Sequence, residues 1–277
     1  MTAEIVLMWL AVTSYAAGAV LYAVGFVFRK ERITAAAMWV SLLGLLPHVA
    51  GIAVRWVRLG HGPYLGFYEV VSSYALMTVI VFGLVALRFK SLRSVGVVLM
   101  PLAFLALGGA MLAPKSDLGI TGTLSSWWLA IHVAFAKLSY GSFIAALGLG
   151  AVFLLRSSAK SERWNERLAR LPEQDKVDDL TFKFVAVGFI FLGIMIAAGA
   201  IWANEAWGRY WSWDPIETWS LISWLVYAIV LHLRLTMGWR GRRFAWAAIG
   251  AFPVMAFAAV GVVIVYNSIH GAYLIGY

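Results

Sequence analysis

Eight apolar runs, each about 20 residues long and bounded by charged residues, decide what this chain can fold into. A helix of that length crosses the hydrocarbon core of a bilayer. The composition agrees, because 62% of the 277 residues are hydrophobic and only 13% are charged, which excludes a soluble globule. The chain is therefore expected to be an all-α integral membrane protein, one bundle of about eight transmembrane helices over residues 1–277. The expected spans lie near residues 4–28, 34–54, 68–89, 94–113, 130–155, 180–203, 218–237 and 245–268.

The basic residues predict the orientation of these spans. Lys and Arg collect in alternate connections, within residues 29–32, 88–93, 156–183 and 234–243. Basic residues in short loops favour the cytoplasmic side, so both termini and the connection after the sixth span are predicted to lie outside. We expect a multi-pass protein of the plasma (inner) membrane, with the connection after the sixth span facing the periplasm or cell exterior. A thylakoid membrane is the alternative. The net charge of +9 then reflects contact with membrane lipid, and no nucleic acid is needed to explain it.

Two further features limit the chemistry of the chain. It contains no cysteine, so any thiol chemistry must use another protein's cysteines. The first apolar run lacks a basic segment before it, so we expect it to stay in the membrane and not to be cleaved. The longest polar stretch, residues 156–179, is predicted to form an amphipathic segment on the cytoplasmic surface.

The predicted external loop at residues 204–219 is crowded with aromatic side chains. Its centre reads Trp-Gly-Arg-Tyr-Trp-Ser-Trp-Asp-Pro-Ile-Glu-Thr-Trp from Trp207 to Trp219. Such rings provide flat surfaces with polar edges, which suit a planar, mostly apolar ligand at the membrane boundary. The alternative is an aromatic belt that only meets lipid headgroups. Asp214, followed by proline and then by Glu217, also predicts a capping box at the start of the seventh span.

Two of the five histidines are predicted to share the level of this loop. His132 lies at the outer start of the fifth span, and His270 lies at the outer end of the eighth. Two imidazoles at one level beside an aromatic surface meet the requirement for bis-histidine ligation of a haem iron.

The other three histidines are expected elsewhere. His232 comes about 27 Å along the seventh span from its outer end, close to the cytoplasmic leaflet. His48 lies too far from that level to share one iron with it, so a ligand opposite His232 would come from a partner chain. We expect His48 to hydrogen-bond a neighbouring helix and His61 to be solvated in an outer turn.

The sequence resembles the CcsA/ResC family of cytochrome c biogenesis proteins, whose haem-handling segment is called the WWD domain. The resemblance rests on the Trp-rich segment followed by Leu-His-Leu-Arg at 231–234. It extends to Trp-Leu-Ala-Ile-His-Val at 128–133, Gly-Pro-Tyr at 62–64, Tyr-Glu at 68–69 and His-Gly-Ala-Tyr at 270–273. These segments span nearly the whole chain.

The resemblance implies a protein that exports haem b and presents it externally to apocytochrome c. The haem would be joined by thioether bonds to a Cys-x-x-Cys-His segment, with this chain one subunit of a haem lyase, or holocytochrome c synthase, acting mainly by positioning. The other subunit would be a CcsB/ResB-like membrane protein. His132 and His270 would be the external axial ligands, and His232 a ligand of the transit site. The residues around the haem edge would be Trp207, Tyr210, Trp211, Trp213 and Asp214, with Arg209 as a candidate partner of a propionate.

A second function stays open from the sequence. HemX-like relatives are haem-binding regulatory membrane proteins without synthase activity. Dependence on a CcsB-like partner and on a Cys-x-x-Cys-His substrate would favour the synthase, whereas an effect on tetrapyrrole synthesis would favour regulation.

Overall fold

The computed structural model describes residues 2–115, 117, 122–158, 168, 171 and 173–271. Within these residues every regular element is helical, and eight helical stretches are long and apolar enough to cross a membrane. The predicted all-α bundle is confirmed. Of the predicted amphipathic segment 156–179, residues 159–167, 169–170 and 172 lie outside the described residues. The elements are α1 (Thr2–Val27), α2 (Glu31–Leu43), α3 (Leu45–Leu59), α4 (Gly66–Arg88), η1 (Lys90–Val95), α5 (Gly96–Leu112), η2 (Gly122–Leu124), α6 (Trp127–Ser157), α8 (Gln174–Trp207), α9 (Pro215–Leu235), α10 (Arg242–Ala256), the π-helical η3 (Phe257–Gly261) and α11 (Val262–Val265).

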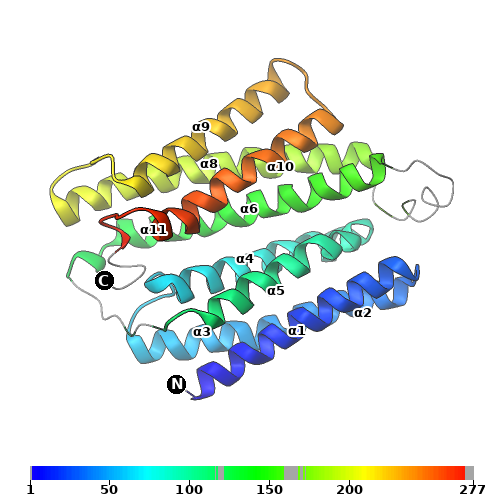
Figure 1. Ribbon diagram of the computed structural model, residues 1–277, viewed down its shortest axis with the longest axis horizontal. Helices are drawn as coiled ribbons and strands as arrows, with labels where there is room; N and C mark the ends of the chain where they lie inside the picture. Colours follow the sequence, from blue (N-terminus) through cyan, green and yellow to red (C-terminus); the bar gives the residue numbers. More distant parts are fainter. Residues whose placement is uncertain are drawn as a thin grey trace.

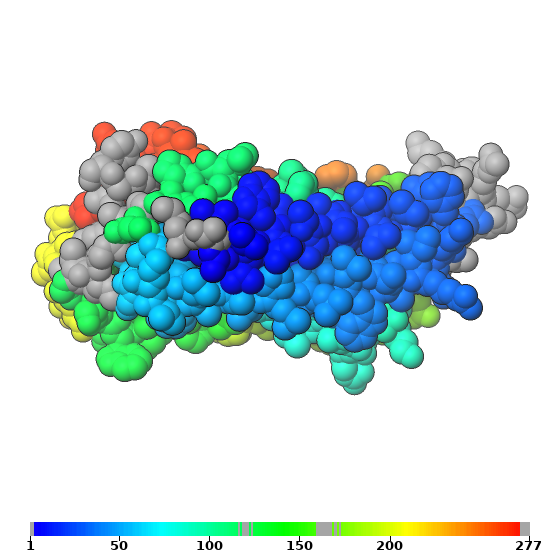
Figure 2. Space-filling view, turned by 90° about the horizontal axis from the view of Figure 1, so that it is seen from below, coloured from blue at the N-terminus to red at the C-terminus, as the bar shows by residue number. Residues whose placement is uncertain are grey.

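The long helices lie side by side along the long axis of the molecule (Figure 1). One buried cluster joins α1, α2, α4 and α5 to one side of α6, and a second joins α6 to α8, α9 and α10. Helix α6 therefore belongs to both halves of the bundle. The first three helices form an outer face along the length of the molecule (Figure 2).

Both ends of the described chain lie at the same end of the bundle as the Trp-rich connection. Helix α1 begins, α11 ends and α8 passes to α9 at this end (Figure 1). The basic connections after α1, α4 and α9 lie at the opposite end. The separation of the two sets of connections agrees with the pattern of basic residues, and the compartment each end faces remains a prediction from that pattern.

The second predicted span is divided into two helices at Gly44. A Cβ atom at Gly44 would lie 2.7 Å from the Cβ atom of Ser14, so the glycine allows α1 to pack closely against the break. Pro47 lacks the N–H group that would complete the helix there.

The Trp-rich connection is shorter than the sequence predicted, because helices extend into both of its ends. Helix α8 continues to Trp207 and ends at Gly208, whose φ of 72° gives a left-handed cap. Helix α9 begins at Pro215 with the predicted capping box formed by Asp214 and Glu217, which is confirmed. The non-helical part of the predicted 204–219 loop is thus residues 208–214.

Candidate functional site

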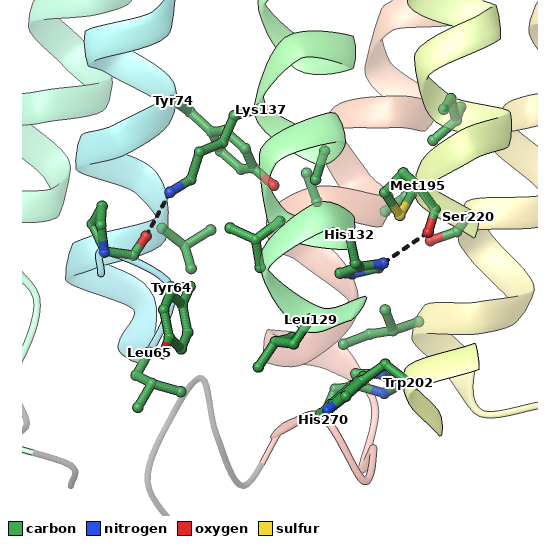
Figure 3. Close-up of a pocket in the computed structure, with 18 of the residues that line it drawn as sticks. Tyr64, Leu65, Tyr74, Leu129, His132, Lys137, Met195, Trp202, Ser220 and His270 are labelled. Carbon is green, nitrogen blue, oxygen red and sulfur yellow. Dashed lines mark hydrogen bonds between the residues drawn. The ribbon is translucent and has the colours of Figure 1, made fainter. Parts of the chain in front are cut away.

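A cavity opens near the Trp-rich end of the bundle, between α4, α6, α8, α9 and the segment from α10 onward (Figure 3). It contains about 990 Å³ of space free of atoms, part of it open to the outside. Its wall is mostly apolar, with a few polar groups that could orient a ligand. The lining includes Tyr64, Leu129, His132, Lys137, Met195, Trp202, Ile216, Ser220 and His270.

His132 is held by a carbonyl group of α8. Its Nδ1 atom lies 2.9 Å from the carbonyl oxygen of Met195, and because a carbonyl only accepts, Nδ1 carries the hydrogen. A Cβ atom at Gly199 would lie 2.5 Å from the same Nδ1, so the glycine leaves room for the ring. The second nitrogen, Nε2, therefore keeps its lone pair for a ligand.

His270 is held in the same manner by a carboxylate. Its Nδ1 atom lies 3.1 Å from Oδ1 of Asp214. The Asp214 carboxylate also accepts hydrogen bonds from the Ser268 hydroxyl at 2.7 Å, from the Ile269 N–H at 2.8 Å and from the Ile216 N–H at 3.0 Å. Burial raises the pKa of Asp214, but the hydrogen bonds from His270, Ser268 and Ile269 outweigh it and bring the pKa to about 2. Asp214 is thus an ionised acceptor that leaves Nε2 of His270 free for a metal.

Trp202 lies beside His270 and near His132 (Figure 3). Its ring centroid is 6.5 Å from that of His132 and 5.9 Å from that of His270. Trp207 packs edge-on against His270 with centroids 5.1 Å apart. The sequence did not single out Trp202, because it lies inside the sixth apolar run and not in the Trp-rich motif.

A second, smaller cavity adjoins the first at the two histidines. It contains about 360 Å³ and shares His132, Met195, Ile216, Ser220 and His270 with the larger one. Tyr210 and Trp211 line this second cavity. The aromatic connection therefore covers the histidine pair from the side opposite α4.

Two other residues of the connection, Trp213 and Arg209, line neither cavity. Trp213 is exposed and packs edge-on against Trp211, with centroids 5.7 Å apart. Arg209 is exposed and lines neither cavity. Its assignment to a propionate remains a prediction.

The structure brings none of the other histidines to this site. His232 is exposed on α9 near its last turn. His48 is fully buried and its Nδ1 atom lies 3.0 Å from the Tyr15 hydroxyl of α1, which agrees with the expected contact to a neighbouring helix. The expectation that His61 is solvated is wrong, since it is 3% exposed and its Nδ1 lies 2.8 Å from the Gly62 carbonyl oxygen.

A buried ion network supports the wall of the cavity beside α4. Glu69 accepts hydrogen bonds from Arg55 at 2.6 Å and from the Leu65 N–H at 2.9 Å. Arg55 and Arg58 each reach Glu4 of α1 as well. Arg55, a basic residue of the predicted outer face, is therefore paired with carboxylates inside the protein.

Lys137 was also missed by sequence reasoning. It lies on α6, five residues after His132, and lines the larger cavity as His132 does. Its ammonium group donates a hydrogen bond to the Pro63 carbonyl oxygen at 2.9 Å (Figure 3). A lysine five residues after His132, inside an apolar run, is the signal that a search for intramembrane charges would have found.

The donor set fits a haem iron better than a bare metal ion. Structural and catalytic metal ions need three or four protein ligands. No three metal-ligating side chains gather anywhere in the described part of the chain. Two imidazoles with free Nε2 atoms, beside aromatic rings and an apolar cavity, are what a planar macrocycle with two open axial positions requires.

Comparison with known proteins points to one family. The family model described as "Cytochrome C assembly protein" matches residues 63–270. The chain is 34% identical to the cytochrome c biogenesis protein CcsA of Chlamydomonas reinhardtii, in an alignment of 228 positions that covers 79% of this chain and 63% of that protein. It is 31% identical to CcsA of Guillardia theta, with 90% and 89% of the two chains covered, and 35% identical to CcsA of Prochlorococcus marinus (strain MIT 9515), with 75% and 74% covered.

A solved structure shares the fold. The cytochrome c haem lyase CcmF superposes with a TM-score of 0.62 at 18% sequence identity. The match covers 94% of this chain and 49% of CcmF, so the chain spans about half the length of that protein. The matched residues 63–270 include the cavity, both histidines that line it and the Trp-rich connection, and on this evidence the chain belongs to the CcsA family of cytochrome c assembly proteins.

Proposed function

We propose that this protein binds haem b between His132 and His270 and presents it for covalent attachment to apocytochrome c. The observation that carries the proposal is that both imidazoles are oriented by a hydrogen bond from Nδ1, which leaves both Nε2 atoms free. Each Nδ1 donates to a fixed acceptor, Met195 in one case and Asp214 in the other, and both rings line the same two cavities. Pairs oriented in this way are prepared to bind an iron through Nε2.

The reaction that follows needs little chemistry from this chain. In thioether formation the S–H group of a cysteine adds across a haem vinyl group, so no group leaves and no oxidant is consumed. The thiols belong to the Cys-x-x-Cys-His segment of apocytochrome c, since this chain has no cysteine. The protein's contribution is to hold the vinyl groups in register with those thiols. The edges of Trp207, Tyr210 and Trp211 would limit the movement of the haem plane.

The haem is proposed to arrive from the opposite end of the bundle. His232 is exposed on the outer surface of α9 near that end. Helix α9 packs mainly on α8 and α10, and His48 belongs to the other half of the bundle. An iron bound by His232 would therefore take its second ligand from another chain, and a CcsB/ResB-like membrane protein is the partner we propose.

Absorption spectra of the purified protein test the external site. Wild type is to be compared with His132→Ala, His270→Ala and His48→Ala, each purified with and without a CcsB-like partner, and haem b is quantified as its pyridine haemochrome. We expect co-purified low-spin haem in wild type and in His48→Ala, and loss of the low-spin signal in the other two variants. Equal spectra for all four proteins would contradict the axial assignment.

The attachment step needs its own assay. Holocytochrome formation is measured with an apocytochrome whose segment is Cys-x-x-Cys-His and with a Ser-x-x-Ser-His control. Thioether product that depends on the partner and on the cysteines is expected. Haem binding without any product would favour the regulatory, HemX-like function.

A further inference from the structure

Another cavity lies at the opposite end of the bundle. It contains about 1020 Å³ and is formed where α1 ends, α2 begins and η1 leads into α5. This end carries the basic connections and is distant from the Trp-rich connection (Figure 1). The residues that line it are Tyr22, Gly25, Phe26, Arg29, Glu31, Thr34, Ala35, Lys90, Ser91, Arg93, Ser94, Val97 and Leu171.

The charge of this lining is strongly positive. Arg29, Lys90 and Arg93 face one carboxylate, that of Glu31. No ion pair joins Lys90 or Arg93 to an acidic residue in the part of the chain that the structure describes. Lys90 and Arg93 repel each other across this space unless an anion lies between them.

Two buried polar groups in the wall lack a partner. The hydroxyl of Tyr22 makes no hydrogen bond although its residue is only 1% exposed, and the Nε atom of Arg93 is buried in the same state. Buried polar groups in folded proteins are nearly always satisfied, so each such group calls for an explanation. A bound anion would accept hydrogen bonds from both.

The wall is built so that these groups stay in place. The ring of Tyr22 rests on Gly96, where a Cβ atom would lie 2.3 Å from Cζ of the ring. Arg29 has a φ of 57°, a left-handed conformation that is unusual for a residue with a side chain. Thr34 approaches α1 at Gly25, where a Cβ atom would lie 2.6 Å from its Oγ1.

We propose that this cavity binds the phosphate group of an anionic phospholipid. A phosphate offers several acceptor oxygens and matches the fork of an arginine. The cavity lies level with the ends of the membrane-spanning helices, which is where lipid phosphates lie. Phe26, Ala35 and Val97 add an apolar wall that suits the glycerol and the first carbons of the acyl chains. A soluble phosphate compound has the same chemistry, and the test distinguishes the two sources.

Native mass spectrometry of the full chain in a neutral detergent tests the site. The probes are dioleoylphosphatidylglycerol, dioleoylglycerol, which lacks the phosphate, and oleate, which carries a carboxylate instead. We expect one tightly retained phosphatidylglycerol, and an affinity about fivefold lower in Arg93→Gln and Lys90→Gln. Arg243→Gln is the matched control, since Arg243 is an exposed cation at the start of α10, at the same end of the bundle.

A conservative variant separates lost binding from lost folding. Tyr22→Phe keeps the ring that packs on Gly96 and against Phe82, and removes only the unpartnered hydroxyl. It is expected to fold as wild type does and to bind phosphatidylglycerol about two- to threefold more weakly.

Inorganic phosphate identifies the source of the ligand. Retention of phosphatidylglycerol in the presence of millimolar phosphate supports the lipid, and its displacement supports a soluble phosphate compound at the same site. The proposal is overturned if oleate binds as tightly as phosphatidylglycerol, or if Arg93→Gln and Arg243→Gln bind alike. Because His132→Ala does not touch this cavity, the result is independent of haem binding at the other end.

Discussion

His270 and Asp214 are joined by a hydrogen bond of 3.1 Å between Nδ1 and Oδ1, although they lie 56 positions apart in the chain. Asp214 also caps α9, so one carboxylate fixes both the start of that helix and the orientation of the imidazole. The Trp-rich connection and the segment after α11 are thereby held together. A change at Asp214 should therefore alter the haem binding that we propose, although Asp214 is not itself a proposed ligand of the iron.

Asp214→Asn is expected to weaken haem retention about 10- to 100-fold, because an amide orients the imidazole less firmly and does not raise its basicity. The amide oxygen still caps α9, so helix content should stay close to that of wild type. Retention of haem b is measured by pyridine haemochrome after repeated washing, and helix content by circular dichroism. Glu217→Gln is the control, since Glu217 belongs to the same capping box and lines the smaller cavity, but its hydrogen bonds are to Ser212 and Asp214 and not to His270.

The low pKa of Asp214 predicts the acid stability of this end of the protein. Its folded pKa of about 2 lies below the ordinary value of 3.8. The carboxylate therefore adds stability that is fully present above about pH 4 and is lost as the pH falls through 2, with a size of about 2 kcal/mol. Thermal unfolding in detergent at pH 6, 4 and 3 should show a steeper fall for wild type than for Asp214→Asn. Parallel curves would mean that Asp214 does not titrate with unfolding.

Gly199→Ala is expected to displace the ring of His132 without replacing either proposed axial ligand. The added Cβ would lie 2.5 Å from Nδ1, which forces the ring away from the Met195 carbonyl. We expect low-spin haem to fall by half or more while the protein still folds, since alanine favours a helix over glycine by about 1 kcal/mol. Gly250→Ala on α10 is the matched control, because nothing lies within 4 Å of a Cβ atom there. Unchanged spectra in both variants would show that the Met195 hydrogen bond is not needed.

The sequence predicted the bundle well because each span carries its own signal. Apolar runs of about 20 residues and basic connections are local properties, and they located all eight spans. The capping box at Asp214 is local as well. Depth along a helix can also be read from residue number, which is how His132 and His270 were expected at one level.

The parts that could not be predicted depend on contacts between distant segments. Nothing near Asp214 in the sequence indicates that it meets His270, and nothing near Glu69 indicates that it pairs with Arg55. The π-helical turn at Phe257–Gly261 was not predicted either, and its residues Ala258 and Ala259 line the larger cavity. His61 was misjudged because a Gly-rich turn suggests a solvated loop, whereas α4 covers this one.

Glu69→Gln is expected to destabilise the wall of the cavity. The change removes a charge that Arg55 meets at 2.6 Å inside the protein, so the cost should be about 2–3 kcal/mol. The Leu65 N–H would lose its ionised acceptor too, which loosens the segment before α4. The melting temperature in detergent measures the effect. Asp179→Asn, which breaks the exposed pair with Lys183, should cost about 0.5 kcal/mol or less, and equal losses in both variants would contradict the structural role of the network.

Lys137 and Arg209 allow a direct comparison of two cations that a haem propionate could meet. Lys137 lines the larger cavity and is fixed by the Pro63 carbonyl, whereas Arg209 is exposed and lines neither cavity. If a propionate enters the larger cavity, Lys137→Met should lower haem retention about tenfold and Arg209→Gln should leave it unchanged. Haem and its dimethyl ester are bound in parallel to purified protein, because the ester removes the carboxylates and should erase the difference between wild type and Lys137→Met. A loss seen only in Arg209→Gln would instead place the propionates at the Trp-rich connection, with the plane of the haem turned towards Tyr210 and Trp211.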